Sequence, residues 1–217
     1  KNEAIQVTEA AGGTSSSTGK TITIGTPYTI DTFLPWDFTS DGDRYVISNV
    51  YECLFEYDAN TCIPVLAESY TNPDDCTWDV KIRENAYWHT GNKLFGDEKV
   101  QIKAEDVKWV MDWTMDPANG SKQQTNLSNV VSSVEVLDDF SLRFTTPEPK
   151  ALFLFTLSRV MIFPKKAIDE GFDLNACPVG SGAFKYVSYQ TDDQVVLEKN
   201  PDSLQCPPRI CTTLKGR

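Results

Sequence analysis

The sequence predicts a globular chain of mixed α and β class, on three observations. Hydrophobic residues make up 40% and aromatic residues 11% of the 217 residues, which is enough to form a packed core. Apolar residues alternate in some segments, as in β-strands, and recur at helical spacing in others. These segments follow one another without a regular period, and the sequence contains no internal repeat.

The chain opens with segments that we expect to form a tether, a strand and a helix. Within residues 1–20, Gly, Ser and Thr dominate from Gly12 to Gly19, which is typical of a flexible tether at the processed end of an exported protein. An artificial end of an expressed chain is equally consistent. Lys20–Gly25 (KTITIG) alternates β-branched residues and predicts a strand, followed by a loop over Thr26–Asp43. Arg44–Tyr57 predicts a helix leading into a short strand, from the spacing of Val46, Val50, Cys53 and Leu54.

The middle of the chain combines turns, a strand and the clearest helix. Asp58–Thr61 and Asn72–Cys76 are rich in turn-forming residues. Thr77–Trp88 begins with strict alternation and predicts a strand whose inner face holds Trp78, Val80 and Ile82. Ala104–Met115 predicts a helix with acidic residues in its first turn, and Asp116-Pro117 ends it. Its inward stripe is Val107, Val110, Met111 and Thr114, and Trp109 pairs with Trp113.

The last third of the chain predicts two hairpins on either side of a short helix. Val130–Thr146 forms the first hairpin, with its turn at Asp138-Asp139. Ala151–Leu157 is apolar and predicts the helix. Gly182–Gln190 and Gln194–Lys199 predict the second hairpin.

The charge of the chain argues against one class of function. It carries 20 basic and 31 acidic residues, a net charge of −11, and no cluster of Lys or Arg. Such a surface repels phosphate backbones, so we expect no nucleic-acid binding. The longest apolar run, Ala151–Phe163, is too short to span a bilayer and contains Arg159.

The cysteine pattern favours an oxidising compartment. No CxxC motif is present and His89 is the only histidine, so we expect no metal site and no cofactor. An even number of cysteines fits up to three disulfides, whereas free buried thiols are the alternative. The six are Cys53, Cys62, Cys76, Cys177, Cys206 and Cys211.

Motifs that could carry catalysis or phosphate binding do not meet their requirements. The glycines of Pro178–Asp202 (PVGSGAFKYVSYQTDDQVVLEKNPD) are followed by a strand, whereas a P-loop needs a Lys-Ser/Thr pair and a helix. No GxSxG motif supplies a nucleophile for His89, so we expect a hydrogen-bonded structural histidine. Acidic pairs such as Asp74-Asp75 fall in predicted turns, and no EF-hand loop is present. We therefore expect that the chain is not an enzyme.

Aromatic side chains are unusually dense in the loop that follows the first predicted strand. Aromatic rings in a loop beside a cleft can stack on a ligand. Packing of the same rings against the following helix is the alternative. The four are Tyr28, Phe33, Trp36 and Phe38.

Three stretches of sequence have patterns that occur together in one family. Asn49–Ser69 (NVYECLFEYDANTCIPVLAES) looks like N-x-Y-E-G-L followed by a Tyr-Asp turn and P-x-L-A-E-S. Thr77–Pro117 (TWDVKIRENAYWHTGNKL…IKAEDVKWVMDWTMDP) resembles a strand, a W-H-D-G turn and a T-A-E-D-V helix. Pro178–Asp202 resembles a P-V-G-T-G-P-Y hairpin ending in N-P-D. In this order they resemble the family 5 extracellular solute-binding proteins of ABC transporters, the peptide- and nickel-binding group, over about Thr21–Asp202.

The resemblance implies a class II periplasmic-binding-protein-like fold, of which this chain holds the first part. Residues 21–43 and 165–217 would belong to lobe I, and residues 44–164 would form a small second α+β domain. The lobe that supplies most of the pocket would be missing, so the chain would be truncated. The glycines after Pro178 would form a tight structural turn. Residues of the segment Thr26–Trp36 would line the cleft, with ligand contacts from Tyr28, Thr29 and Phe33.

The chain departs from the family pattern at several positions. Cys53 and Cys76 replace glycines, Ala183 replaces a proline, and Phe95–Val100 is an insertion. Lys103 replaces an N-capping threonine, whose cap is usually worth about 1 kcal/mol. Cys62 and Cys76 follow neighbouring turns, so we expect a disulfide between them.

These features together predict a non-enzymatic, extracytoplasmic solute-binding component of an ABC importer. We expect it in the periplasm or at the cell surface as a lipoprotein, with a lipid anchor as its only membrane contact. Its partners would be the permease subunits and a small solute, which we expect to be a peptide rather than nickel because only one histidine is present. A short interaction module derived from such a receptor, and more remotely a hydrolase, are the alternatives.

Overall fold

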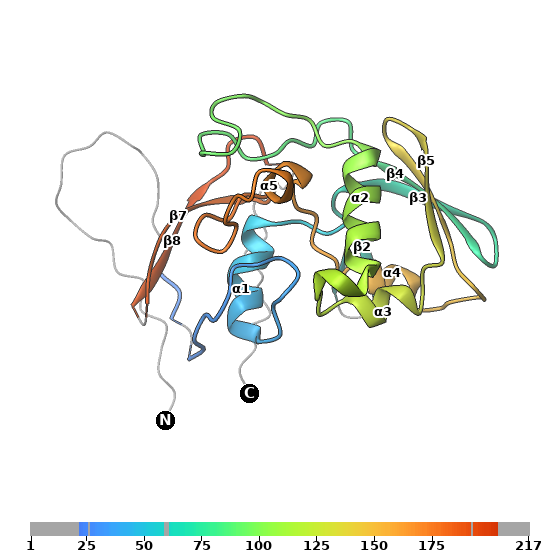
Figure 1. The fold of residues 1–217 in the computed structure, drawn as a ribbon, viewed down its shortest axis with the longest axis horizontal. Helices are drawn as coiled ribbons and strands as arrows, with labels where there is room; N and C mark the ends of the chain where they lie inside the picture. The colour runs from blue at the N-terminus through green and yellow to red at the C-terminus, as the bar shows by residue number, and fades with distance from the viewer. Residues whose placement is uncertain (1–21, 26, 59–60, 192, 204–217) are drawn as a thin grey trace.

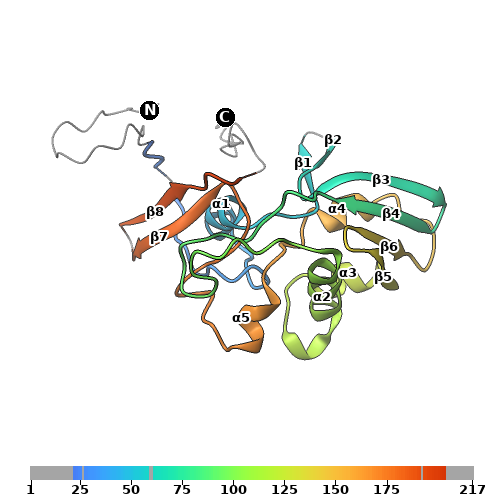
Figure 2. The ribbon, with the colours of Figure 1, turned by 90° about the horizontal axis from the view of Figure 1, so that it is seen from above.

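The computed structural model describes residues 22–25, 27–58, 61–191 and 193–203, and its elements gather in two groups (Figures 1 and 2). One group contains helix α1 (Asp41–Val50) beside the hairpin of β7 (Phe184–Gln190) and β8 (Gln194–Lys199). The other contains a four-stranded sheet with helix α2 (Ala104–Met115) against it. The mixed α and β class predicted from the sequence is confirmed.

The four-stranded sheet is antiparallel throughout, in the order β3-β4-β6-β5. Its strands are β3 (Ala67–Asp74), β4 (Thr77–Ile82), β5 (Ser133–Asp138) and β6 (Ser141–Thr145). The predicted alternation in β4 is confirmed, because Val80 and Ile82 are buried and Trp78 is partly buried. The predicted stripe of α2 is also buried: Val107, Val110, Met111 and Thr114.

Shorter elements complete the fold. A second hairpin joins β1 (Phe55–Asp58) to β2 (Thr61–Pro64). The predicted helix after Ala151 is α4 (Phe153–Leu157), which packs against β1. The short helices η1 (Pro117–Asn119), α3 (Gln124–Ser128) and α5 (Lys165–Asp169) and the strand β3 were not predicted from the sequence.

Helix α1 begins earlier and ends earlier than predicted. Ser40 caps it, with its Oγ accepting a hydrogen bond from the Asp43 N–H at 3.1 Å. The backbone becomes extended at Tyr51, so Cys53 and Leu54 are buried but lie beyond the helix. The expected domain boundary at residues 43 and 44 therefore falls inside α1, and the division into domains stays a prediction.

The strand predicted over Lys20–Gly25 is not present in the residues that are described. Residues 22–25 form no strand, and Ile22 and Ile24 are 61% and 51% exposed. A strand needs a neighbour for its backbone hydrogen bonds, and none pairs with this segment within the described residues. The predicted tether at residues 1–20 lies outside them.

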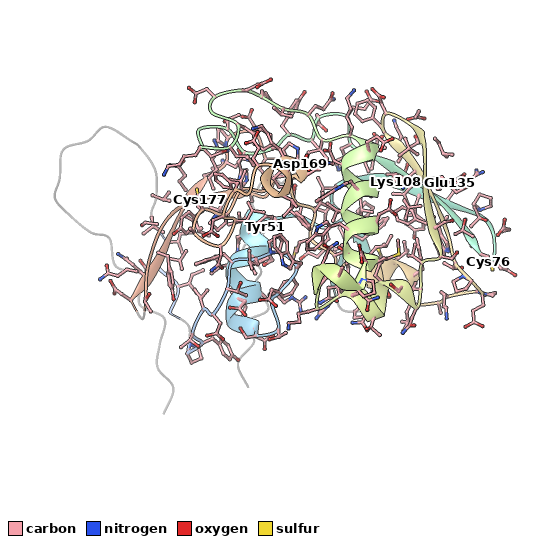
Figure 3. All side chains as sticks on the ribbon, viewed as in Figure 1. Tyr51, Cys76, Lys108, Glu135, Asp169 and Cys177 are labelled. Carbon is pink, nitrogen blue, oxygen red and sulfur yellow. The ribbon has the colours of Figure 1, made fainter. Side chains whose placement is uncertain are left out.

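The expected disulfide between Cys62 and Cys76 is wrong, because both residues are free thiols. Cys62 lies in β2, whereas Cys76 lies in the turn at the far end of the β3–β4 hairpin (Figure 3). Strand β3, which runs from near β2 to that turn, has 8 residues and is roughly 25 Å long. A disulfide tolerates Cα separations only up to about 7 Å. Cys206 and Cys211 lie outside the described residues.

The N-terminus of α2 lacks the side-chain cap that threonine would provide, as predicted. Lys103 makes no capping hydrogen bond, because an ammonium group has no acceptor. Its backbone N–H instead donates to the Asp106 carboxylate at 2.8 Å. None of the helices within the described ranges is long and apolar enough to cross a bilayer.

Candidate functional site

The segment expected to line a cleft is held in place by side chains from distant parts of the chain. The Asp43 carboxylate on α1 accepts hydrogen bonds from the backbone N–H groups of Asp31 and Thr32, at 2.7 and 3.1 Å. The Asn175 side-chain oxygen accepts one from the Phe33 N–H at 2.8 Å. These side chains replace the strand partners that the segment lacks, so its backbone has a defined path.

Tyr28 and Thr29, two of the three predicted ligand-contacting residues, lie on the surface against the first turn of α1. The Tyr28 ring is 46% exposed and lies 5.9 Å from the Tyr45 ring. Thr29 is exposed. A Cβ atom added to Gly42 would lie 2.1 Å from the Thr29 carbonyl oxygen, which is far inside van der Waals contact. A glycine in the first turn of α1 therefore lets the segment approach the helix.

Phe33, the third predicted residue, points inward. Its ring is only 4% exposed and packs edge-on against Tyr186 at 5.6 Å and Tyr189 at 5.1 Å. The Tyr189 O–H also donates to the Ile30 carbonyl at 3.2 Å. Phe33 thus fastens the segment to β7, whereas the packing alternative placed these aromatic rings against the following helix. Ligand contact by any of the three residues stays a prediction.

The glycine-rich turn after Pro178 packs against the end of α1. A Cβ on Gly180 would overlap the Val50 carbonyl oxygen, and one on Gly182 would lie 2.5 Å from the Asn49 carbonyl oxygen. The Gly182 N–H donates to the Val50 carbonyl at 2.9 Å, and the Gly180 N–H donates to His89 Nδ1 at 3.4 Å. Both amides are used inside the protein, so the turn is structural and presents neither amide to a phosphate.

His89 is buried against this turn. Its backbone N–H donates to the Gly180 carbonyl at 2.8 Å, and its Nε2 lies 2.9 Å from the Gly182 carbonyl. With Nδ1 accepting from Gly180, Nε2 carries the proton and the ring is neutral. Burial lowers the pKa of His89 to about 4, although the Gly182 hydrogen bond opposes this shift. The predicted structural role is confirmed.

Glu52 is a buried carboxyl group on the other side of the same turn. It is 3% exposed, and its Oε2 accepts a hydrogen bond from Ser181 Oγ at 2.8 Å. Its Oε1 has no hydrogen-bond partner in the described structure. Burial raises the pKa of Glu52 to about 7, against the opposing effects of Ser181 and the charge of Arg83.

The group of Ser181, His89 and Glu52 is not a catalytic triad. A triad needs the serine hydroxyl to hydrogen bond to the imidazole. Here the hydroxyl donates to Glu52, and both imidazole nitrogens face the backbone of the turn. All three residues are about 3% exposed, so no substrate can reach them. The described residues also contain no group of three or more His, Cys, Asp or Glu placed to hold a metal ion.

Sequence reasoning did not identify the residues that hold these segments. Glu52 had a signal, because an acidic residue between Tyr51 and Cys53 in an apolar stretch predicts a buried carboxyl group. No sequence signal pointed to Asn175 or Asp43. Asn175 is 142 residues from Phe33, whose amide it binds, and Asp43 is 12 residues from Asp31, whose amide it binds.

Comparison with known families gives one match. Residues 61–210, well over half of the chain, match the family described as bacterial extracellular solute-binding proteins, family 5 Middle. The match includes the glycine-rich turn and the whole four-stranded sheet.

Individual relatives agree with this match. The chain is 28% identical over 183 residues to the glutathione-binding protein GsiB of Pectobacterium atrosepticum, covering 82% of this chain and 34% of that one. It is 30% identical over 171 residues to a putative ABC transporter peptide-binding protein of Brucella ovis, covering 74% and 31%. The chain therefore spans about a third of the length of these curated relatives.

Solved structures show the same fold. The periplasmic binding protein DppA of Helicobacter pylori, in complex with the peptide STSA, superimposes with a TM-score of 0.73 at 26% identity, covering 82% of this chain and 38% of that one. NikZ of Campylobacter jejuni, in complex with Ni(L-His), gives a TM-score of 0.69 at 26% identity, covering 82% and 35%.

Proposed function

Because the chain belongs to the bacterial extracellular solute-binding proteins of family 5, we propose that it is part of the solute-binding component of an ABC importer and that its solute is a peptide. The family supports a binding role outside the cytoplasm. The peptide-binding and glutathione-binding relatives favour a peptide, although NikZ, with its nickel complex, belongs to the same group.

The anchored segment over residues 27–36 is the observation that carries this proposal. Its backbone is fixed by Asp43 and Asn175, and it exposes Tyr28 and Thr29 beside α1. A fixed backbone can pair with the backbone of a peptide whatever the peptide's side chains are. In this proposal Tyr28 and Thr29 contact the solute, while Phe33 positions the segment from within.

The proposal extends to partners and location. The chain would deliver its solute to the permease subunits of an importer from the periplasm or cell surface, held there by a lipid anchor. A module that binds another protein without any solute is the alternative.

Thermal unfolding with a peptide pool tests the proposal. The protein is isolated as its own cells make it, and its intact mass is compared with the 24.3 kDa of the 217-residue chain. A peptide at 100 times its Kd stabilises the folded state by about 2.7 kcal/mol, which raises the melting temperature of a chain of this size by roughly 5–10 °C.

Matched variants locate the contact. Tyr28→Ala should weaken the shift, whereas Tyr57→Ala, which removes an exposed tyrosine on β1, should leave it unchanged. No shift with any di-, tri- or tetrapeptide pool would contradict peptide binding. Concentration-dependent association with a second protein, under the same conditions, would then favour the interaction module.

A further inference from the structure

The glycine-rich turn over residues 178–183 lies where the two groups of elements are joined. After α1 the chain crosses to the four-stranded sheet through residues 51–54, and it returns through residues 160–163 (Figure 1). These two connections lie side by side, because the Ile162 N–H donates to the Glu52 carbonyl at 2.8 Å. The turn packs against the first connection, so its docking helps to hold the two groups together.

Two ionisable side chains are fixed to this turn. Glu52, on the first connection, accepts a hydrogen bond from Ser181 Oγ at 2.8 Å. His89, in the loop after β4, lies with Nδ1 3.4 Å from the Gly180 N–H and with Nε2 2.9 Å from the Gly182 carbonyl. Both ionisable side chains are 3% exposed, and neither takes part in an ion pair within the described ranges. Each is therefore shielded from water without an opposite charge at contact distance.

The hydrogen bonds of His89 require a neutral ring when the turn is docked. Nδ1 accepts the Gly180 N–H, and an imidazolium has no nitrogen that can accept. In water the imidazole carries both protons below about pH 6.5. In mildly acidic surroundings, docking of the turn therefore removes the Nδ1 proton.

The surroundings of Glu52 favour the protonated carboxyl group. Its Oε1 has no hydrogen-bond partner in the described structure, and burying an ionised carboxylate with an unbonded oxygen is unfavourable. A proton on Oε1 leaves Oε2 free to accept from Ser181. In water the carboxyl group is ionised above about pH 4.5. Docking of the turn therefore adds a proton to Glu52.

The direction of each pKa agrees with this geometry. Burial raises the pKa of Glu52 from 4.5 to about 7, and the Ser181 hydrogen bond and the charge of Arg83 only oppose the shift. Burial lowers the pKa of His89 from 6.5 to about 4, and the charge of Lys185 adds to the shift. Between pH 4.5 and 6.5 the docked pair holds one proton on Glu52, and the undocked pair holds one proton on His89.

The other ionisable groups around the turn keep their charge over this range. Burial raises the pKa values of Tyr51, Cys53 and Cys177 above their ordinary alkaline values, so all three stay protonated. Arg159, which precedes the second connection, stays charged because a guanidinium group loses its proton only in strong alkali. The proton balance of the turn therefore rests on Glu52 and His89.

We propose that docking of the glycine-rich turn moves one proton from His89 to Glu52, so that the two groups of elements join without net uptake or release of protons in mildly acidic surroundings. The Nδ1 proton of the imidazolium passes to water, and the carboxylate takes one proton from water, so two opposite charges disappear together. The joined state then keeps the same stability over about pH 4.5–6.5. This property suits an extracellular protein, whose surroundings change in pH, and it does not depend on the solute.

The single histidine of the chain makes one test direct. Imidazole nitrogen chemical shifts of the ¹⁵N-labelled protein should show, at about pH 5.5, a neutral ring with its proton on Nε2. The same tautomer is expected in Glu52→Gln, because the backbone bonds of His89 do not involve Glu52. An imidazolium in the folded protein at this pH would overturn the proposal.

The number of protons exchanged on unfolding tests both groups. Calorimetric unfolding at about pH 5.5, in two buffers of different ionisation enthalpy, measures this number. Relative to wild type, Glu52→Gln should take up about one more proton and His89→Gln should release about one more, while the double variant should match wild type. Glu105→Gln removes an exposed carboxyl group on α2 and should also match wild type. If His89→Gln does not fold, Glu52→Gln and its control still decide, and a Glu52→Gln count equal to wild type rejects the proposal.

Hydrogen exchange at the Gly182 amide tests the turn itself, because this N–H donates to the Val50 carbonyl at 2.9 Å. After correction for the intrinsic rate at each pH, the opening equilibrium of the wild type should stay within about twofold from pH 4.5 to 6.5. It should fall about tenfold per pH unit in Glu52→Gln and rise about tenfold per pH unit in His89→Gln. Equal slopes in the wild type and both variants would show that docking of the turn moves no proton between the two groups.

Discussion

Replacing Glu52 with glutamine should change how the stability of the protein depends on pH. Burial raises the pKa of this carboxyl group from 4.5 to about 7. Between these values the folded state holds a proton that the unfolded state has lost, so unfolding releases it. Stability therefore falls as pH rises from 4.5 to 7, and the fall amounts to about 3 kcal/mol at 1.36 kcal/mol per pKa unit.

His89, on the other side of the same turn, has the opposite effect. Burial lowers its pKa from 6.5 to about 4. Between these values the unfolded state holds the proton and the folded state does not. Stability therefore rises with pH from 4 to 6.5, again by about 3 kcal/mol. In the wild-type protein the two effects oppose each other over pH 4.5–6.5 and largely cancel.

Single variants should separate these two effects. In Glu52→Gln the amide oxygen can still accept the Ser181 hydrogen bond, so the pH-dependent part alone is removed. As pH rises from 4 to 8, the free energy of unfolding of the variant should therefore increase by about 3 kcal/mol relative to that of the wild type. His89→Gln should gain a similar amount relative to wild type as pH falls from 6.5 to 4.

Urea unfolding at a series of pH values measures both differences. Intrinsic fluorescence reports unfolding, because the chain has five tryptophans, and equal m-values would show that the unfolded states are comparable. Subtracting the wild-type curve removes the groups that both proteins share. If the difference in unfolding free energy between Glu52→Gln and the wild type does not change from pH 4.5 to 8, the raised pKa is refuted. The burial of an unpaired carboxyl oxygen would be refuted with it.

Two further substitutions test the packing described above. Gly180→Ala should destabilise the protein by roughly 1–3 kcal/mol in urea, because the added methyl group overlaps the Val50 carbonyl oxygen. Gly25→Ala is the control, because no atom lies within 4 Å of the added methyl group, and its free energy of unfolding should stay within about 0.5 kcal/mol of wild type. Equal effects of the two substitutions would show that the turn at Gly180 is not closely packed. Lys103→Thr should stabilise the protein by about 1 kcal/mol in the same assay, because the hydroxyl can cap α2. Lys103→Ala is the control, because it loses the ion pair with Asp139 without gaining a helix cap. If Lys103→Ala raises the free energy of unfolding by the same amount, capping is not the cause of the stabilisation.

Local patterns were enough to predict several elements. Helix α2 matched its predicted bounds because its apolar spacing and its Asp-Pro end are both local signals. The two predicted hairpins were confirmed for the same reason. The strand over Lys20–Gly25 was not, because alternation shows a preference for extended backbone and says nothing about a pairing partner.

The candidate site was harder to predict. Aromatic density drew attention to the loop but could not say which rings point inward, and Phe33 does. Neighbouring turns in the sequence suggested a Cys62–Cys76 disulfide, whereas the length of β3 separates them. The Asn175 and Asp43 anchors depend on tertiary contacts that sequence spacing does not encode.

The contact between Ser181 and Glu52 joins residues 129 positions apart, which has a consequence for synthesis. A ribosome adds about 5–20 residues per second, so Glu52 waits on the order of 10 s for the turn that buries it. During that time its carboxyl group is in water and ionised at neutral pH. Burial then requires uptake of a proton by part of the population, so the docking of this turn should become less favourable as the surrounding pH rises.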